Sequence, residues 1–132
     1  GTFRTFVSFD IRDIALKTLD SARLEFNGGI TIEGNPFATS PTGLGPLQVE
    51  VLDYGTLEGP DYDAPGNQLL SLSSNPRDTQ HDIRSSIQSA ANASKARFQL
   101  RLRFSGETNS NNAIDRLSWL NNGNICLAIT FH

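Results

Sequence analysis

The sequence predicts an all-β protein, an antiparallel β-sandwich of jelly-roll-like form with one short helix. Three observations indicate this fold class. Several segments alternate apolar and polar side chains with a period of two, a single segment changes to helical spacing, and the connections are rich in glycine and proline. We expect one domain over residues 1–132, because a chain of this length can bury a core without a metal or a disulfide.

The clearest predicted strand covers residues 97–104, with the sequence RFQLRLRF. Its apolar side chains share one face and are Phe98, Leu100, Leu102 and Phe104. Its polar side chains share the other face, which we expect to be exposed to solvent, and are Arg97, Gln99, Arg101 and Arg103. The other strands are expected to pack against the apolar face.

The remaining elements follow from the same periodicities. Alternation predicts strands at residues 2–11, 21–26, 30–33, 47–54 and 125–131, with residues 68–73 as a short strand or an extended connection. Apolar residues at helical spacing predict one helix at Asp82–Ala93, with Thr79 or Asp82 as its cap. The expected core consists of Phe9, Leu24, Val49, Leu100, Leu102, Ile125, Leu127 and Ile129.

Charge and composition exclude several functional classes. The net charge of -3 gives no overall attraction to nucleic acid or to an anionic membrane, and no apolar run is long enough for a membrane helix. Cys126 is the only cysteine, so we expect a core or near-core thiol and no internal disulfide. The chain has no serine-hydrolase elbow, phosphate-binding loop or paired metal-ligand spacing. His81 and Asp82 are neighbours in the chain, and such side chains rarely face one another as an acid/base pair. We therefore expect no enzyme activity.

A series of strand motifs supports a resemblance to a known family. The motifs, in chain order, are RTFVSFDI, SARLEF, LQVEVLDYG, the helix-like DIRSSIQSAANAS and FQLRL. This order resembles DNRLRE domains, which are carbohydrate-binding-module-like β-sandwiches of secreted bacterial surface proteins. The resemblance implies a non-catalytic module located outside the cell or on its surface. Because such modules carry further strands before the RTFVSFDI motif, it also implies either a domain that lacks its N-terminal strands or a sheet edge completed by another chain.

Aromatic and basic side chains are the candidate ligand-binding residues, since the resemblance carries over only structural positions. Tyr54, Tyr62 and Trp119 are the aromatic residues able to stack on a sugar ring while offering a polar tip. Two alternative arrangements are open for Arg97, Arg101 and Arg103. They either pair across strands with carboxylates such as Glu25 and Glu50, or form a ladder that binds an acidic polysaccharide.

Acidic residues near the Gly/Pro-rich segment 55–66 suggest one further site. Asp53, Glu58, Asp61 and Asp63 could present oxygen atoms to calcium, a hard cation that prefers such ligands. The alternative is an ordinary acidic surface loop. No other cofactor is predicted.

Two functions therefore follow from the sequence. The first is a carbohydrate-binding module whose partner is a polysaccharide. The second is a structural or adhesive module that contacts a neighbouring surface protein or a second copy of itself.

Overall fold

The computed structural model describes residues 5–28, 30–33, 37, 45–62, 64–104, 116–119 and 125–131, and only the backbone of residues 30–33, 62 and 116–119. The strands are β1 (Thr5–Asp10), β2 (Leu19–Phe26), β3 (Ile30–Glu33), β4 (Leu47–Val51), β5 (Asn67–Leu72), β6 (Thr79–Asp82), β7 (Arg97–Phe104), β8 (Arg116–Trp119) and β9 (Ile125–Phe131). The helices are α1 (Arg84–Asn92) and the short 3-10 helices η1 (Arg12–Ile14) and η2 (Gly59–Tyr62).

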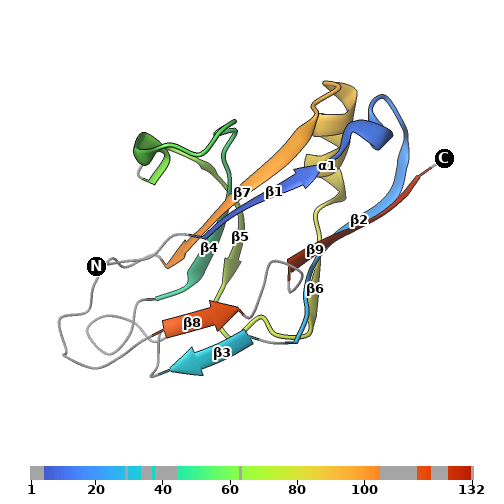
Figure 1. Cartoon of the computed structure of the whole chain (residues 1–132). Helices are drawn as coiled ribbons and strands as arrows, with labels where there is room; N and C mark the ends of the chain where they lie inside the picture. Colours follow the sequence, from blue (N-terminus) through green and yellow to red (C-terminus); the bar gives the residue numbers. More distant parts are fainter. Residues whose placement is uncertain are drawn as a thin grey trace.

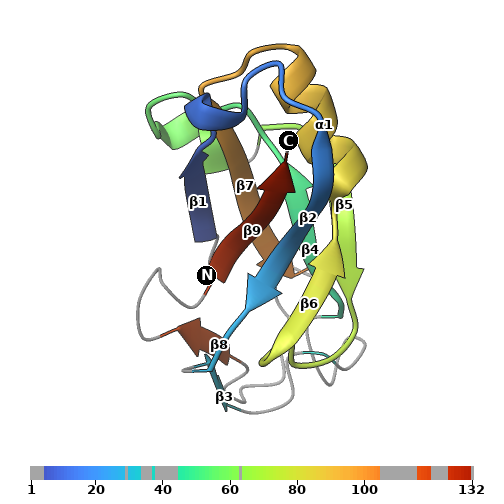
Figure 2. The ribbon, with the colours of Figure 1, turned by 90° about the vertical axis from the view of Figure 1, so that its right-hand side faces the viewer.

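Two antiparallel sheets form the sandwich. The first contains four strands in the order β1-β7-β4-β5, and the second contains three in the order β6-β2-β9. The two sheets face each other, and α1 lies at one end of the second sheet (Figures 1 and 2). Strands β3 and β8 form a separate two-stranded ladder at the opposite end (Figure 1). The predicted all-β sandwich with one short α-helix is confirmed.

The strand order is that of a jelly roll with one position unfilled. A jelly roll contains about eight strands in two sheets. Its second, seventh, fourth and fifth strands form one sheet, which corresponds here to β1-β7-β4-β5. Its eighth, third and sixth strands correspond to β9-β2-β6. The first strand would lie beside β9, a position that no strand fills in the part of the chain that the structure describes.

The core lies between the sheets and includes one face of α1. Of the predicted core residues, Leu24, Val49, Leu100, Leu102 and Ile125 are buried. The other three, Phe9, Leu127 and Ile129, are only partly buried and pack against this core. The helix contributes Ile87, Ala90 and Ala91.

The helix and the strand bounds differ slightly from the prediction. The helix begins at Arg84, and Ile83 occupies the capping position without a side-chain hydrogen bond. Asp82 still satisfies a free amide, because its Oδ1 accepts a hydrogen bond from the Arg84 N–H at 2.9 Å. The segment 68–73 is a true strand, and β4 ends three residues before Tyr54.

The prediction that the polar face of β7 is exposed is wrong for its two central residues. Gln99 is 5% exposed and Arg101 is 3% exposed. The physical reason is that the segment after β4 folds back over this face. The Leu52 N–H donates to the Gln99 carbonyl at 3.1 Å, and the Asp61 carbonyl accepts a hydrogen bond from Arg101 Nη1 at 2.9 Å. Residues 52–62 therefore cover polar side chains that the periodicity assigned to solvent.

Candidate functional site

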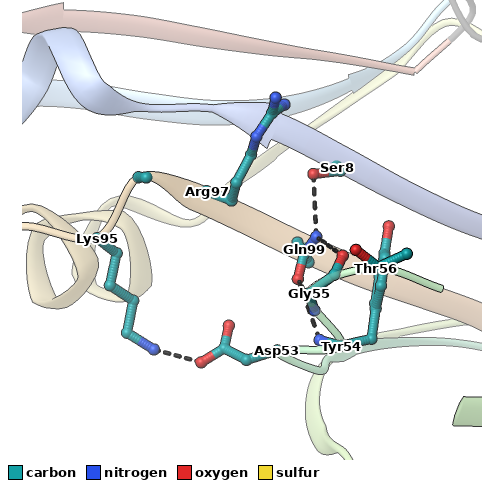
Figure 3. A pocket seen from close by; sticks show the side chains of 9 residues that line it. Ser8, Asp53, Tyr54, Gly55, Thr56, Lys95, Arg97 and Gln99 are labelled. Atoms are coloured by element: carbon teal, nitrogen blue, oxygen red, sulfur yellow. Dashed lines mark hydrogen bonds and ion pairs between the residues drawn. The ribbon is translucent and has the colours of Figure 1, made fainter. Parts of the chain in front are cut away.

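The buried amide of Gln99 holds the segment that follows β4. Its Oε1 accepts hydrogen bonds from the backbone N–H groups of Tyr54 and Gly55, both at 3.0 Å. Its Nε2 donates to the Gly55 carbonyl at 3.1 Å and to Ser8 Oγ at 3.2 Å (Figure 3). Gly55 has φ +62, a conformation that favours glycine. One side chain of β7 thus ties this loop to both β7 and β1.

An open surface depression of about 840 Å³ lies beside this anchor. It is formed where β1 and the start of β7 meet the loop after β4 (Figure 3). Its lining residues are Ser8, Asp53, Tyr54, Gly55, Thr56, Lys95, Ala96, Arg97 and Gln99. The depression therefore combines an aromatic ring, hydroxyl groups, a carboxylate and two cations.

The charged groups of the depression differ in their partners. Lys95 Nζ forms an ion pair with Asp53 Oδ2 (Figure 3). Arg97 is exposed, and its guanidinium makes no hydrogen bond or ion pair with the residues that the structure describes. Its strand partner Asp10 is already bound by Arg12 at 2.6 Å. The hydrogen bonds from Arg12 lower the pKa of Asp10 to about 2, and the nearby charge of Arg97 acts in the same direction.

The aromatic residue that lines the depression is Tyr54. Its ring contacts the Phe6 ring edge to face, with centroids 5.4 Å apart and planes at 83°. Burial raises the pKa of the Tyr54 phenol above its ordinary value, and a side-chain hydrogen bond with Ser8 acts in the opposite direction. The phenol is therefore neutral at physiological pH and can both donate and accept hydrogen bonds.

Two of the three candidate arginines are bound to a carboxylate. Arg101 Nη2 lies 3.1 Å from Glu50 Oε1, and Arg103 Nε lies 2.8 Å from the same oxygen. The expected cross-strand pairing with Glu50 is confirmed, whereas Glu25 pairs with Arg23 at 3.4 Å. The three-arginine ladder is wrong because Arg101 is buried by residues 52–62. Arg97 is the member that reaches the depression.

The two aromatic residues named as ligand-binding candidates are not brought to this site by any described contact. Tyr62 ends η2, and only its backbone is described. Trp119 ends β8, where it pairs with Ile30 of the separate two-stranded ladder, and its side chain also lies outside the description. Tyr54, which the sequence named as a stacking aromatic, is the one that lines the depression.

The predicted calcium ligands that the structure describes, Asp53, Glu58 and Asp61, do not form one group. Asp53 faces Lys95, and Asp61 Oδ2 accepts a hydrogen bond from the Glu58 N–H at 2.7 Å, which closes a turn of its own loop. Asp63 lies outside the described residues. Among those that are described, no three His, Cys, Asp or Glu side chains are grouped to hold a metal ion.

His81 and Cys126 also have structural surroundings. His81 Nε2 forms a hydrogen bond with Thr79 Oγ1 at 2.9 Å, and its ring contacts the Phe26 ring edge to face. Burial lowers the pKa of His81 below its ordinary value. Cys126 Sγ accepts a hydrogen bond from Asn27 Nδ2 at 3.3 Å, and the residue is partly buried.

Sequence reasoning missed Gln99, Ser8 and Lys95 as site residues. Gln99 was visible only as one polar residue in a row of arginines, and Lys95 as a single cation before a strand. Their roles depend on contacts with the loop after β4, at a separation of about 40 residues for both Gln99 and Lys95. No local signal marks such contacts.

Comparisons with known proteins give no assignment. No family model, no curated protein and no solved structure matches this chain. Within the part of the chain that the structure describes, no helix has the length and apolar character needed to cross a membrane.

Proposed function

We propose that this protein is a non-catalytic extracellular module that binds carbohydrate in the depression beside Tyr54. The observation that carries the proposal is the combination of an aromatic ring packed on Phe6 with the exposed guanidinium of Arg97, which has no partner among the described residues, in one open depression. Sugar rings present apolar faces that pack on aromatic side chains, and hydroxyl groups that hydrogen-bond to polar ones. Tyr54 would supply the packing surface, and Arg97 would supply several donors.

The rigidity of the loop supports this function. Because the Gln99 side chain holds the backbone of Tyr54 and Gly55 by hydrogen bonds, the protein itself orders this part of the loop. A binding site that is ordered beforehand loses less conformational entropy on association. Thr56 and Ser8 add hydroxyl groups to the same surface.

The acidic groups of the depression favour binding over hydrolysis. Most glycoside hydrolases use a pair of carboxyl groups on either side of the bond that is cleaved. Asp53 is the single carboxylate among the lining residues, and it is paired with Lys95. This arrangement can orient a hydroxyl group but does not supply an acid and a base.

The experiment that tests the proposal is a glycan array with the isolated protein, followed by affinity measurements on the best glycan with two variants. Arg97→Gln removes the free guanidinium, and we expect an affinity loss of about tenfold, which is one charged contact of about 1.4 kcal/mol. Arg77→Gln is the matched control, because Arg77 is exposed and lies outside the depression. Absence of any glycan ligand, or equal affinity of Arg97→Gln and Arg77→Gln, would refute the proposal.

A structural or adhesive role is the second candidate function. The observation that favours it is the uncharged edge of β9, which lies beside the unfilled jelly-roll position.

A further inference from the structure

The outer edge of β9 lacks the protection that edge strands usually carry. Natural edge strands avoid unwanted pairing by means of charged residues, prolines or bulges. β9 has the sequence ICLAITF, with no charged residue and no proline. Among the described strands it pairs with β2 alone. The strand at the other edge of this sheet, β6, is shorter and contains Asp82.

The apolar side chains of β9 are covered less well than those directly opposite them. Leu127 pairs with Leu24 and Ile129 pairs with Ala22, and residues directly opposite in an antiparallel pair share a face. Leu24 and Ala22 are 0% exposed, whereas Leu127 and Ile129 are only partly buried. We attribute the extra exposure to the side of β9 on which no described strand lies.

The same side of the sandwich contains the edge of the first sheet. β1 is the end strand of its sheet, and it lies on the same side of the molecule as β9 (Figure 2). Phe9 of β1 is partly buried, although its partner Phe98 is 3% exposed. The three predicted core residues that are incompletely buried, Phe9, Leu127 and Ile129, thus belong to the two end strands on this side of the described sandwich.

We propose that β9 pairs in antiparallel orientation with β9 of a second copy of this protein, across a two-fold axis at Ala128. This interface would act through protein contacts and does not depend on the proposed carbohydrate binding. In this register Leu127 of one copy faces Ile129 of the other, so apolar residues meet on the inner face. Ala128 faces its own counterpart on the outer face.

A second copy suits this edge for two physical reasons. A two-fold axis brings the same strand against itself in antiparallel orientation, so one surface supplies both halves of the interface. Self-pairing usually places like charges near one another, but β9 has none, so no repulsion opposes it. Because a two-fold axis normal to the sheet keeps both inner faces on one side, the three-stranded sheets of the two copies become one continuous sheet.

The first test is light scattering over a wide concentration range, up to about 1 mM, which corresponds to weak association of about -4 kcal/mol. We expect a dimer in the unmodified protein. Ala128→Glu places two carboxylates opposite each other at the axis and should raise the dimer dissociation constant at least about tenfold. Within one copy the new carboxylate lies opposite Arg23, so the fold is retained, and a melting curve checks this. Ser89→Glu adds the same charge on the exposed surface of α1 and should leave the dimer unchanged.

The second test is oxidative crosslinking, which reads the register and needs no change of charge. In the variant Cys126→Ser with Ala128→Cys, opposed residues have Cα atoms about 4.5 to 5.5 Å apart, within the range of a disulfide. The control, Cys126→Ser with Gln80→Cys, carries the thiol on β6 at the other edge of the sheet. We expect a covalent dimer from the first variant and a much lower yield from the control.

Three results would overturn the proposal. They are a monomer throughout the concentration range, a dimer that Ala128→Glu does not weaken, and equal crosslinking of the two cysteine variants. Glycan affinity is measured on the same samples, because the depression lies on the other sheet. A monomer that binds glycan refutes only the interface, and a β9 dimer that binds none refutes only the carbohydrate function.

Discussion

The buried carboxylate of Glu50 allows a direct test of what stabilises the covered polar face of β7. Glu50 is 6% exposed and binds both Arg101, which is 3% exposed, and Arg103. Glu50→Gln keeps the shape of the side chain but removes its charge. Arg101 would then lose the charge of the buried carboxylate that lies 3.1 Å from its Nη2, while its hydrogen bond to the Asp61 carbonyl is retained.

The expected cost can be estimated from this geometry. Removing one partner of a buried ion pair costs about 3 to 5 kcal/mol, and the remaining amide acceptor places this variant near the lower figure, at about 3 kcal/mol. With an unfolding entropy of about 2.1 cal/mol/K per residue, this chain of 132 residues should melt about 10 °C lower.

The assay is thermal unfolding followed by circular dichroism, with Arg103→Gln as the comparison. The Arg103 side chain is 30% exposed, so its loss should lower the melting temperature by only a few degrees. A fall of less than about 3 °C for Glu50→Gln, or an equal fall for both variants, would refute the idea that the buried Glu50 charge is required by Arg101.

Three further predictions address the core, the loop and the response to pH. Leu100→Ala, at a position that is 0% exposed, should cost about 2 to 5 kcal/mol through lost burial and a residual cavity, and melting within about a degree of the parent would contradict this. Gln99→Leu leaves the amides of Tyr54 and Gly55 without their acceptor, so their hydrogen exchange should accelerate and glycan affinity should fall, while unchanged exchange would show that the loop does not depend on Gln99. Burial lowers the pKa of His81 in the folded state, so the unfolded chain binds a proton at a higher pH than the folded protein does. The free energy of unfolding should therefore decrease as the pH falls below the ordinary His pKa of about 6.5. His81→Gln should therefore melt at a temperature that changes less between about pH 7.5 and 5.5, and parallel curves for the two proteins would rule out this source of pH dependence.

Local periodicity determined which segments become strands and which becomes the helix. The alternation of RFQLRLRF specifies two faces of β7 because successive side chains in any strand point in opposite directions. Helical spacing of Ile83, Ile87 and Ala90 likewise predicted α1 to within two residues at each end. These properties depend on neighbours a few positions away, so the sequence alone was sufficient for them.

Tertiary structure alone decided what lies on each face. Periodicity placed Gln99 and Arg101 opposite the core, but solvent exposure also depends on segments far along the chain, and here residues 52–62 return to cover them. The same long-range folding places Lys95 and Arg97 beside Tyr54 and pairs Asp53 with Lys95.

The degree of burial of β9 has a similar origin. The sequence assigned Leu127 and Ile129 to the core, and their direction is inward as predicted. Whether an inward side chain is fully buried depends on the strand beside it, which is set by sheet order and not by local pattern. The sequence therefore determined the elements and their apolar faces, whereas the tertiary structure decided which polar face was covered and lined a surface depression, and which apolar strand lies at an edge of the described sheet.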